Sequence, residues 1–382
     1  MRDVAIVAAG MTRFGELWDA SLRDLFAEAA TEALKNAKAD HLDALFVGNM
    51  SAGQFVGQEH LGPLLADELG MAGVAAARVE SACASGGVAL RSAFIEVASG
   101  ASDVVLAAGV EKMTDSTEVT EVLATASDQE LEAYHGITFP GLYAMIARAH
   151  MERWGTTEED LSWVSVKNHK HGALNPKAQF RSAVSLDDVM RSSPVAEPLR
   201  LLHCSPVSDG AAAVLVVPLA DAKRYTDRPV RIAASGLATG PMALASRKDI
   251  AFLDAVEASA RRAYKMAGHG PADINVAEVH DCFAIAEICA IEALGLVERG
   301  AGNAAARKGD TALGGRLPVN TSGGLKAKGH PVGATGIAQA IEIFEQLRGE
   351  AGARQVADAR VGLTQNMGGS GASSVVHIFE RV

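Results

Sequence analysis

Stretches with strand-like and helix-like apolar spacing alternate along the first part of this 382-residue chain. "VAIVAAG" (4–10) predicts a buried strand, "LRDLFAEAATEALKNA" (22–37) has helical spacing, and "LDALFVGNM" (42–50) predicts another strand. The helix-like segment 79–100 is followed by the strand-like "VVLAAGVEKM" (104–113). Such alternation predicts an α/β fold, in which helices cover a largely parallel sheet.

The chain also repeats part of itself. "DVAIVAAG" (3–10) is similar to "PVRIAASG" (229–236), and "SDGAAAVLVV" (208–217) is similar to "GGSGASSVVHIF" (368–379). Two regions therefore open and close with similar strands, and they join near 218–229, where Pro, Asp and Lys gather.

We therefore expect two similar α/β halves, residues 1–225 and 226–382, which suits a length beyond that of one ordinary compact domain. Residues 114–205 fit the alternation least well and carry several aromatic side chains. An insertion of this length in the first half predicts a lid or binding region.

Composition excludes several classes of protein. The net charge of −11 argues against a nucleic-acid-binding or anionic-membrane surface. The first residues resemble a first strand more than a signal peptide, because their apolar run is short and flanked by charges. No apolar run approaches the ~20 residues that span a bilayer. The 4 cysteines form no CxxC pair, so we expect reduced thiols in a cytoplasmic protein.

Cys83 lies in "ACASGG" (82–87), just before a helix-like run. Small neighbours would let a substrate reach the sulfur, and the N–H groups of a helix N-terminus favour the thiolate. We therefore expect the thiol pKa to fall from its usual ~8.5 toward neutrality. The alternative is a small buried thiol that fills space.

A second candidate stretch is "INVAEVHDCFAIAEICAIEALG" (274–295). Its His280, Asp281 and Cys282 fall where a strand gives way to a helix, the place where open α/β sheets bind ligands. Cys289 lies further along that helix, on the same face as Cys282, and is interpreted as core. Metal binding through His280 and Cys282 alone is a weak hypothesis, because no cluster of further ligands is nearby.

Two glycine-rich loops complete the set. "GHPVGATG" (329–336) carries His330, which a turn could also satisfy through backbone contacts, and the loop matches no nucleotide-binding motif. "QNMGGSG" (365–371) joins two strand-like runs, and its backbone N–H groups could serve as oxyanion donors.

Together and in this order, the four stretches resemble the loops of the thiolase family: "ACASGG" its nucleophile loop, "HDCFA" its second loop, "GHPVGATG" its histidine loop and "QNMGGSG" its C-terminal glycine loop. The resemblance runs from Val4 to the C-terminus. It implies the thiolase fold of two similar halves, each with a mixed five-stranded sheet, layered α-β-α-β-α.

Ordinary thiolases carry "NEAF" where this chain has "HDCF" (280–283). They also carry a second cysteine in the C-terminal loop, where this chain has Gln365, Asn366 and Met367. The cysteine is thus absent from one loop and present, as Cys282, in another. That pattern is similar to the archaeal and sterol-carrier-protein types, whose "HDCF" cysteine takes the acid/base role.

The resemblance implies an acetyl-CoA C-acetyltransferase that condenses two acetyl-CoA molecules to acetoacetyl-CoA. Cys83 would carry the acetyl group, His330 would accept the thiol proton, and Cys282 would remove the α-proton of the second substrate. His280 and His330 would hold the enolate oxygen. A backbone N–H at Gly368, or one residue away, would hold the tetrahedral intermediate with that of Cys83.

A further segment, "ALASRKD" (243–249), resembles one that contacts the pantetheine of coenzyme A, and it nominates Ser246. No metal or organic cofactor is expected, because a thioester activates its own α-carbon. The expected assembly is a homodimer or homotetramer, with a complex containing an OB-fold/zinc-ribbon protein and 3-hydroxy-3-methylglutaryl-CoA synthase that feeds mevalonate synthesis. The alternatives are a degradative thiolase for longer or aromatic acyl chains and a non-catalytic thiolase-like scaffold.

Overall fold

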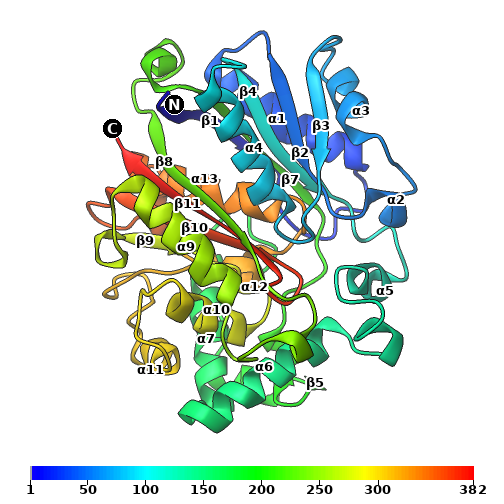
Figure 1. Ribbon diagram of the computed structural model, residues 1–382, viewed down its shortest axis with the longest axis vertical. Helices are drawn as coiled ribbons and strands as arrows, with labels where there is room; N and C mark the ends of the chain where they lie inside the picture. Colours follow the sequence, from blue (N-terminus) through cyan, green and yellow to red (C-terminus); the bar gives the residue numbers. More distant parts are fainter. Residues whose placement is uncertain (1) are drawn as a thin grey trace.

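The computed structural model describes residues 2–382, and most of its strands form one mixed sheet (Figure 1). The order across this sheet is β3-β2-β4-β7-β1-β8-β11-β10-β9. The members are β1 (Val4–Met11), β2 (Ala44–Gly48), β3 (Ala75–Val79), β4 (Val105–Glu111), β7 (Gly210–Pro218), β8 (Val230–Thr239), β9 (Val276–Glu278), β10 (Val361–Gly368) and β11 (Ser373–Arg381). A separate hairpin joins β5 (Pro194–Ala196) to β6 (Leu199–Arg200).

The α-helices are α1 (Leu22–Ala37), α2 (Ala52–Phe55), α3 (Leu61–Glu68), α4 (Ser85–Ser99), α5 (Val119–Ala124), α6 (Phe139–Trp154), α7 (Glu158–Gly172), α8 (Leu186–Arg191), α9 (Asp254–Ala267), α10 (Ala284–Ala293), α11 (Gly302–Lys308), α12 (Gly324–Lys328) and α13 (Thr335–Arg348). Within residues 2–382, none of these helices combines the length and the apolar character needed to span a membrane.

The first half of the sheet has the five strands expected of it. β2 pairs in parallel with β3 and β4, whereas β7 runs antiparallel to both β4 and β1. The sheet is therefore mixed, and the largely parallel sheet predicted from the alternation alone is wrong. The continuous apolar runs in the sequence indicate strands that are buried on both faces. Antiparallel strands can be buried in the same way, so these runs do not determine strand direction.

The second half is smaller. β8, β11 and β10 are antiparallel neighbours, and β9 pairs in parallel with β10. Within the described residues, an isolated bridge between Ala277 and Val319 stands where a fifth strand is expected. β1 and β8 join the halves through two residue pairs, Ala5 with Arg231 and Ile6 with Val230. The predicted division at residue 225 stays a prediction.

Alternating side chains bury both faces of the sheet, as the sequence of β7 illustrates. Ala212, Val214 and Val216 lie in one core cluster with α4 and α13, whereas the intervening Ala213 and Leu215 lie in another with α1. α9 packs on β8 and β11. The mixed α/β architecture implied by the family resemblance is thus confirmed, with α4 and α13 as its inner helices.

Glycine lets the N-termini of the two inner helices touch. A Cβ on Gly86 would lie 2.5 Å from the carbonyl oxygen of Gly333, and one on Gly336 would lie 2.2 Å from the amide nitrogen of Gly87. Any side chain would separate the helices. This contact brings the loop before α4 against the loop before α13, and these loops carry Cys83 and His330.

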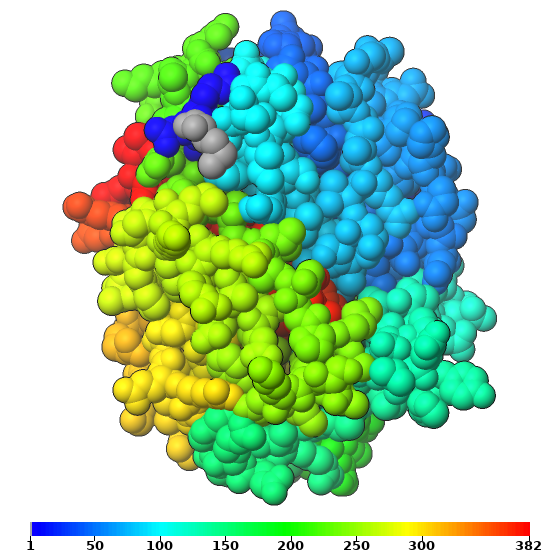
Figure 2. All heavy atoms as spheres, viewed as in Figure 1, coloured from blue at the N-terminus to red at the C-terminus, as the bar shows by residue number. Residues whose placement is uncertain are grey.

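The insertion, residues 114–205, contains α5 to α8 and the β5–β6 hairpin. Its α6 and α7 pack on α10, and α7 also packs on α11 and α12, so the segment lies beneath the sheet in Figure 1. In Figure 2 a small red area of the C-terminal part of the chain is visible between the surfaces of the two halves and this segment.

Candidate active site

The four residues predicted to be catalytic come together. One side-chain atom each of Cys83, His280 and His330 lies within 4.8 Å of the others. The rings of His280 and His330 meet edge to face, with centroids 5.0 Å apart. Cys282 lines the same cavity as Cys83 and His330. Loops far apart in the sequence therefore supply one reactive centre, which we call the thiol cavity.

The thiol cavity has a volume of about 200 Å³ and a mostly apolar wall. Much of that wall comes from the predicted insertion. The lining residues are Cys83, Met113, Thr120, Leu123, Phe139, Pro140, Tyr143, Val195, Leu201, Cys204, Ser205, Pro206, Val207, Cys282, Phe283, His330, Val332 and Gly369. The insertion thus forms one side of the cavity, as a binding region would.

Cys83 sits on a constrained turn two residues before α4. Ala82 has a left-handed φ of 49°, and the Ser85 hydroxyl accepts from the Ser81 N–H at 2.9 Å. Loss of solvation raises the pKa of the Cys83 thiol to about 12, although the N–H groups of Gly369 and Cys83 itself lower it. The expected fall toward neutrality is therefore wrong, because burial outweighs the helix N-terminus.

His330 is oriented by Thr335, the first residue of α13. The Thr335 hydroxyl donates to the carbonyl of Pro331 at 3.0 Å, so it can only accept from Nδ1 of His330, 2.7 Å away. Nε2 of His330 is then unprotonated. Burial, with a smaller contribution from Lys328, lowers the pKa of His330 to about 3. The resting pair is a thiol and a neutral imidazole that can accept its proton.

Cys282 follows β9 and precedes α10, as predicted. Burial raises the pKa of this thiol well above its usual range, and a hydrogen bond with Tyr143 lowers it. In the resting state, the one hydrogen of the Tyr143 hydroxyl is donated to the Gly369 carbonyl at 3.0 Å. The Tyr143 ring stacks on Phe283 with centroids 4.5 Å apart. Sequence reasoning missed Tyr143, whose only signal was an aromatic residue inside the insertion.

Buried carboxylates hold the reactive loops in place. Asp281 accepts from the Leu325 N–H and from the Asn168 amide, both at 2.7 Å, so it faces away from the thiol cavity. Glu111 accepts from the Gly333 N–H at 3.0 Å and from the loop after β2. Both groups act on loop position rather than on a ligand.

Two weaker predictions fare differently. Gly368 ends β10 but does not line the thiol cavity; its neighbour Gly369 does, and the N–H of Gly369 reaches the Cys83 thiol. The expected donor is thus shifted by one residue. Ser246 is exposed at the end of a short 3-10 helix (Leu244–Ser246) and lies outside this cavity.

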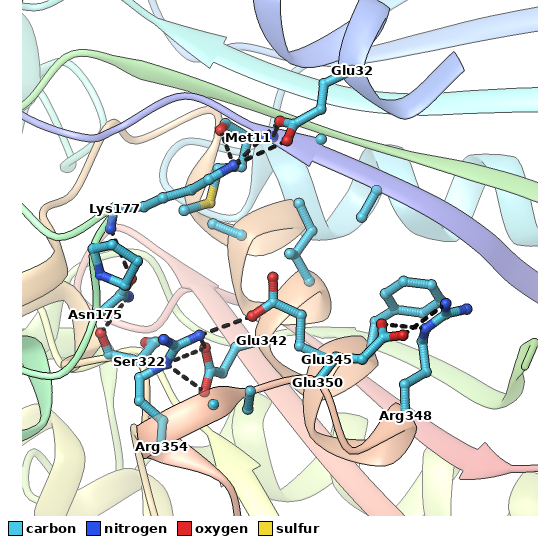
Figure 3. A pocket seen from close by; sticks show the side chains of 18 of the residues that line it. Met11, Glu32, Asn175, Lys177, Ser322, Glu342, Glu345, Arg348, Glu350 and Arg354 are labelled. Carbon is cyan, nitrogen blue, oxygen red and sulfur yellow. Dashed lines mark hydrogen bonds and ion pairs between the residues drawn. The ribbon is translucent and has the colours of Figure 1, made fainter. Parts of the chain in front are cut away.

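A second and larger cavity of about 610 Å³ lies between β1, α1 and α13; we call it the charged cleft (Figure 3). Lys177 contacts Glu32 at 3.2 Å, and Arg354 contacts Glu342 at 3.0 Å and Glu345 at 2.8 Å. No cysteine or histidine is among its described lining residues.

Two family models match successive parts of the chain. The family model described as "Thiolase, N-terminal domain" matches residues 4–220, and "Thiolase C-terminal domain-like" matches residues 236–381. The acetyl-CoA acetyltransferase of Methanothermobacter thermautotrophicus is 56% identical, over 100% of both chains. That of Methanocaldococcus jannaschii is 49% identical, over 99% of both. A solved structure, the "Ltp2-ChsH2(DUF35) aldolase", superposes with a TM-score of 0.87 at 27% identity, over 99% of this chain and 98% of the other.

Proposed function

The chain belongs to the thiolase family, and from that premise we propose that it is an acetyl-CoA C-acetyltransferase, which condenses two acetyl-CoA molecules to acetoacetyl-CoA and coenzyme A. The observation that carries this proposal is that Cys83, Cys282 and His330 line one cavity, with His280 within 4.8 Å of Cys83 and His330. A scaffold that performs no chemistry has no need of two thiols and two buried imidazoles in one place.

The first step forms the acetyl-enzyme. Nε2 of His330 accepts the thiol proton as the Cys83 sulfur attacks the acetyl carbonyl carbon. The backbone N–H groups of Cys83 and Gly369, which already contact this sulfur, are suited to hold the oxyanion. As the bond from carbon to the coenzyme sulfur breaks, Cys282 donates its proton to that sulfur, and coenzyme A leaves as a thiol.

The second step forms the carbon–carbon bond. The Cys282 thiolate left by the first step removes a proton from the α-carbon of a second acetyl-CoA. His330, now protonated, and Nε2 of His280 hold the enolate oxygen. The enolate attacks the acetyl group, and the Cys83 sulfur leaves and recovers its proton from His330. Each catalytic group has then returned to its resting protonation state.

The raised thiol pKa values suit this sequence. A Cys282 that is protonated at rest can act as the acid for the leaving coenzyme, and only then becomes the base for the second substrate. Both cysteines must be free thiols, so we place the enzyme in the reducing cytoplasm.

A degradative role on longer or aromatic 3-oxoacyl-CoA esters is the second candidate. One feature of the thiol cavity favours this second candidate. Its apolar wall, with Leu123, Phe139 and Leu201, extends beyond the space that one acetyl group occupies. Values of kcat/KM for thiolysis of acetoacetyl-CoA and of longer homologues separate the two. Preference for acetoacetyl-CoA supports the condensing enzyme.

Condensation of two thioesters is uphill, so the product must be removed. We therefore propose a homo-oligomer in complex with an OB-fold/zinc-ribbon protein and 3-hydroxy-3-methylglutaryl-CoA synthase, supplying mevalonate synthesis. The name of the superposed aldolase pairs Ltp2 with a second component, ChsH2(DUF35). This pairing supports the proposal that the present chain also binds a partner protein. Co-purification from the native source tests the complex, and isolation of the chain alone with full activity contradicts it.

The decisive test is a single-turnover experiment. Mixing the protein with acetyl-CoA should release one equivalent of coenzyme A per active site and leave an acetyl group on Cys83, located by peptide mass spectrometry. Acetoacetyl-CoA should then appear in the steady state. Absence of an acetyl-enzyme would overturn the proposed activity.

A further inference from the structure

Asn366 joins three of the four motif loops through a single side chain. It lies near the end of β10 and is 1% exposed. Its Oδ1 accepts from the Gly87 N–H at 3.2 Å. Its Nδ2 donates to the Cys83 carbonyl at 3.0 Å and to Nδ1 of His280 at 3.0 Å. The amide thus contacts the start of α4 on one side and the second loop on the other.

These partners leave the amide only one orientation. The Gly87 N–H can only donate and the Cys83 carbonyl can only accept. Reversing the amide would therefore place two donors together at Gly87 and two acceptors together at Cys83. Both Nδ2 hydrogens are therefore committed, one to Cys83 and one to His280. It follows that Nδ1 of His280 is an acceptor and that the ring proton is on Nε2.

His280 and His330 are consequently opposite tautomers, although their ring centroids are only 5.0 Å apart. Thr335 makes Nε2 of His330 an acceptor, whereas Asn366 makes Nε2 of His280 a donor. Within residues 2–382, Nε2 of His280 is buried and has no hydrogen-bond partner. One imidazole is ready to take a proton, and the other is ready to receive an oxyanion.

We propose that Asn366 is a positioning residue that fixes His280 as a neutral Nε2–H donor toward the enolate oxygen. The catalytic role of the Nε2–H group rests on the proposed function, whereas the tautomer of His280 follows from the hydrogen bonds alone. It also explains a second property of the cluster. Cys83, His280 and His330 offer one sulfur and two nitrogens at a spacing that could hold a metal ion, yet a protonated Nε2 cannot be a ligand.

A direct measurement on the wild-type protein needs no variant. Solid-state ¹⁵N NMR of histidine-labelled protein distinguishes protonated from unprotonated ring nitrogens, and His280→Asn and His330→Asn samples assign the signals. We expect protonated Nε2 with bare Nδ1 for His280, and the reverse for His330. Protonated Nδ1 on His280 in the wild type would overturn the proposal. If the tautomers are as expected but no thiolase activity is found, only the proposed function fails.

Asn366→Asp provides a near-isosteric test of the same control. A carboxylate would accept from Nδ1–H of His280, as in the carboxylate–histidine pairs of metal sites, and so expose the bare Nε2 to the cavity. We expect condensation to fall about 100-fold or more, the size of a lost oxyanion donor, with acetyl-enzyme formation falling less than condensation. A merely structural defect would slow both steps alike, and that result would contradict the proposal.

The same variant should gain a property. Titration with Co²⁺ should produce a thiolate-to-cobalt charge-transfer band in Asn366→Asp, and none in the wild type or in the double variant Cys83→Ala/Asn366→Asp. A band of equal strength in the wild type would show that His280 is not held as an Nε2–H donor. A circular dichroism spectrum and a melting temperature equal to those of the wild type verify that Asn366→Asp has folded. If this variant does not fold, the NMR measurement on the wild type decides whether His280 carries its proton on Nε2.

Discussion

The thiol cavity and the charged cleft differ in size, lining and purpose. The charged cleft is the larger, about 610 Å³ against about 200 Å³, and its labelled charged side chains are paired with one another (Figure 3). The thiol cavity is mostly apolar, yet three free cysteines line it, namely Cys83, Cys204 and Cys282. Next to Cys83 and His330, the Nε2 atom of His280 is buried with no hydrogen-bond partner among the described residues. Free cysteines and a buried histidine, rather than volume or charge, mark the place where chemistry occurs.

The ion pairs in the charged cleft predict that its charged groups bind a ligand poorly. Arg354 is held by Glu342 and Glu345, and Arg348 by Glu350. A ligand would have to break these contacts before forming its own. We therefore expect substitutions in the thiol cavity to change rates, and substitutions in the charged cleft to change stability.

The largest effect should follow from Cys83→Ala. Without the nucleophile no acetyl-enzyme forms, and turnover should fall roughly 10⁴-fold or more. Stopped-flow release of coenzyme A measures the first step. Cys289→Ala is the matched control, because that cysteine is buried on α10 outside the thiol cavity. Its rate per folded molecule should equal that of the wild type.

Cys282→Ala should separate the two half-reactions. The variant should still take up an acetyl group on Cys83, but condensation should fall on the order of 10²- to 10⁴-fold, because the α-proton has no base. Mass spectrometry of the acetyl-enzyme and a steady-state acetoacetyl-CoA assay provide the two readings. Normal condensation by this variant would remove Cys282 from the mechanism.

Arg354→Met tests the charged cleft. The substitution leaves Glu342, which is 4% exposed, without its buried partner, so we expect unfolding to become easier by about 3 kcal/mol. Urea denaturation followed by tryptophan fluorescence measures this change. Arg191→Met removes an exposed pair with Asp187 and should change stability by less than ~1 kcal/mol. A loss of kcat in folded Arg354→Met would show that the cleft takes part in the reaction.

The pH dependence of alkylation tests the resting state of Cys83. A group with its pKa raised to about 12 stays a thiol at neutral pH, so its thiolate fraction grows about tenfold per pH unit up to that value. Iodoacetamide should therefore react faster at each step from pH 7 to pH 9, without a plateau. A plateau near pH 7 would indicate a preformed thiolate–imidazolium pair.

The smallest effect should come from Tyr143→Phe. The change removes the hydroxyl that contacts the Gly369 carbonyl and Cys282 but keeps the ring on Phe283. Loss of one such hydrogen bond should slow condensation about threefold to tenfold. Condensation and acetyl transfer are compared in the same preparation, and equal slowing of both would place Tyr143 outside the Cys282 step.

Much of the site could be read from the sequence because its chemistry lies in short motifs. Cys83, His280, Cys282 and His330 each follow a strand or precede a helix, and their loops meet as the family resemblance implied. The hydrogen bonds that orient these four side chains could not be predicted from the sequence. The bond from Asn366 to His280 spans 86 residues, and its meaning depends on which backbone groups occupy the other side of the amide.

The errors have a common physical origin. The pKa of Cys83 was expected to fall because the helix is a local feature, whereas the burial that raises it is produced by the whole fold. The parallel sheet was expected because strand burial is visible in sequence and strand direction is not. The α/β alternation was accessible because buried strands and amphipathic helices each leave a compositional trace, whereas the glycine contact between α4 and α13 joins distant segments and was not predicted.

The hydrogen bonds between β1 and β8 have a mechanical consequence. They make one continuous sheet of the two halves within residues 2–382, so a movement of one half against the other would have to break strand pairing. We therefore expect the distance between the two halves to be set by the fold, and the size of an acceptable acyl group to depend on the wall that the insertion contributes.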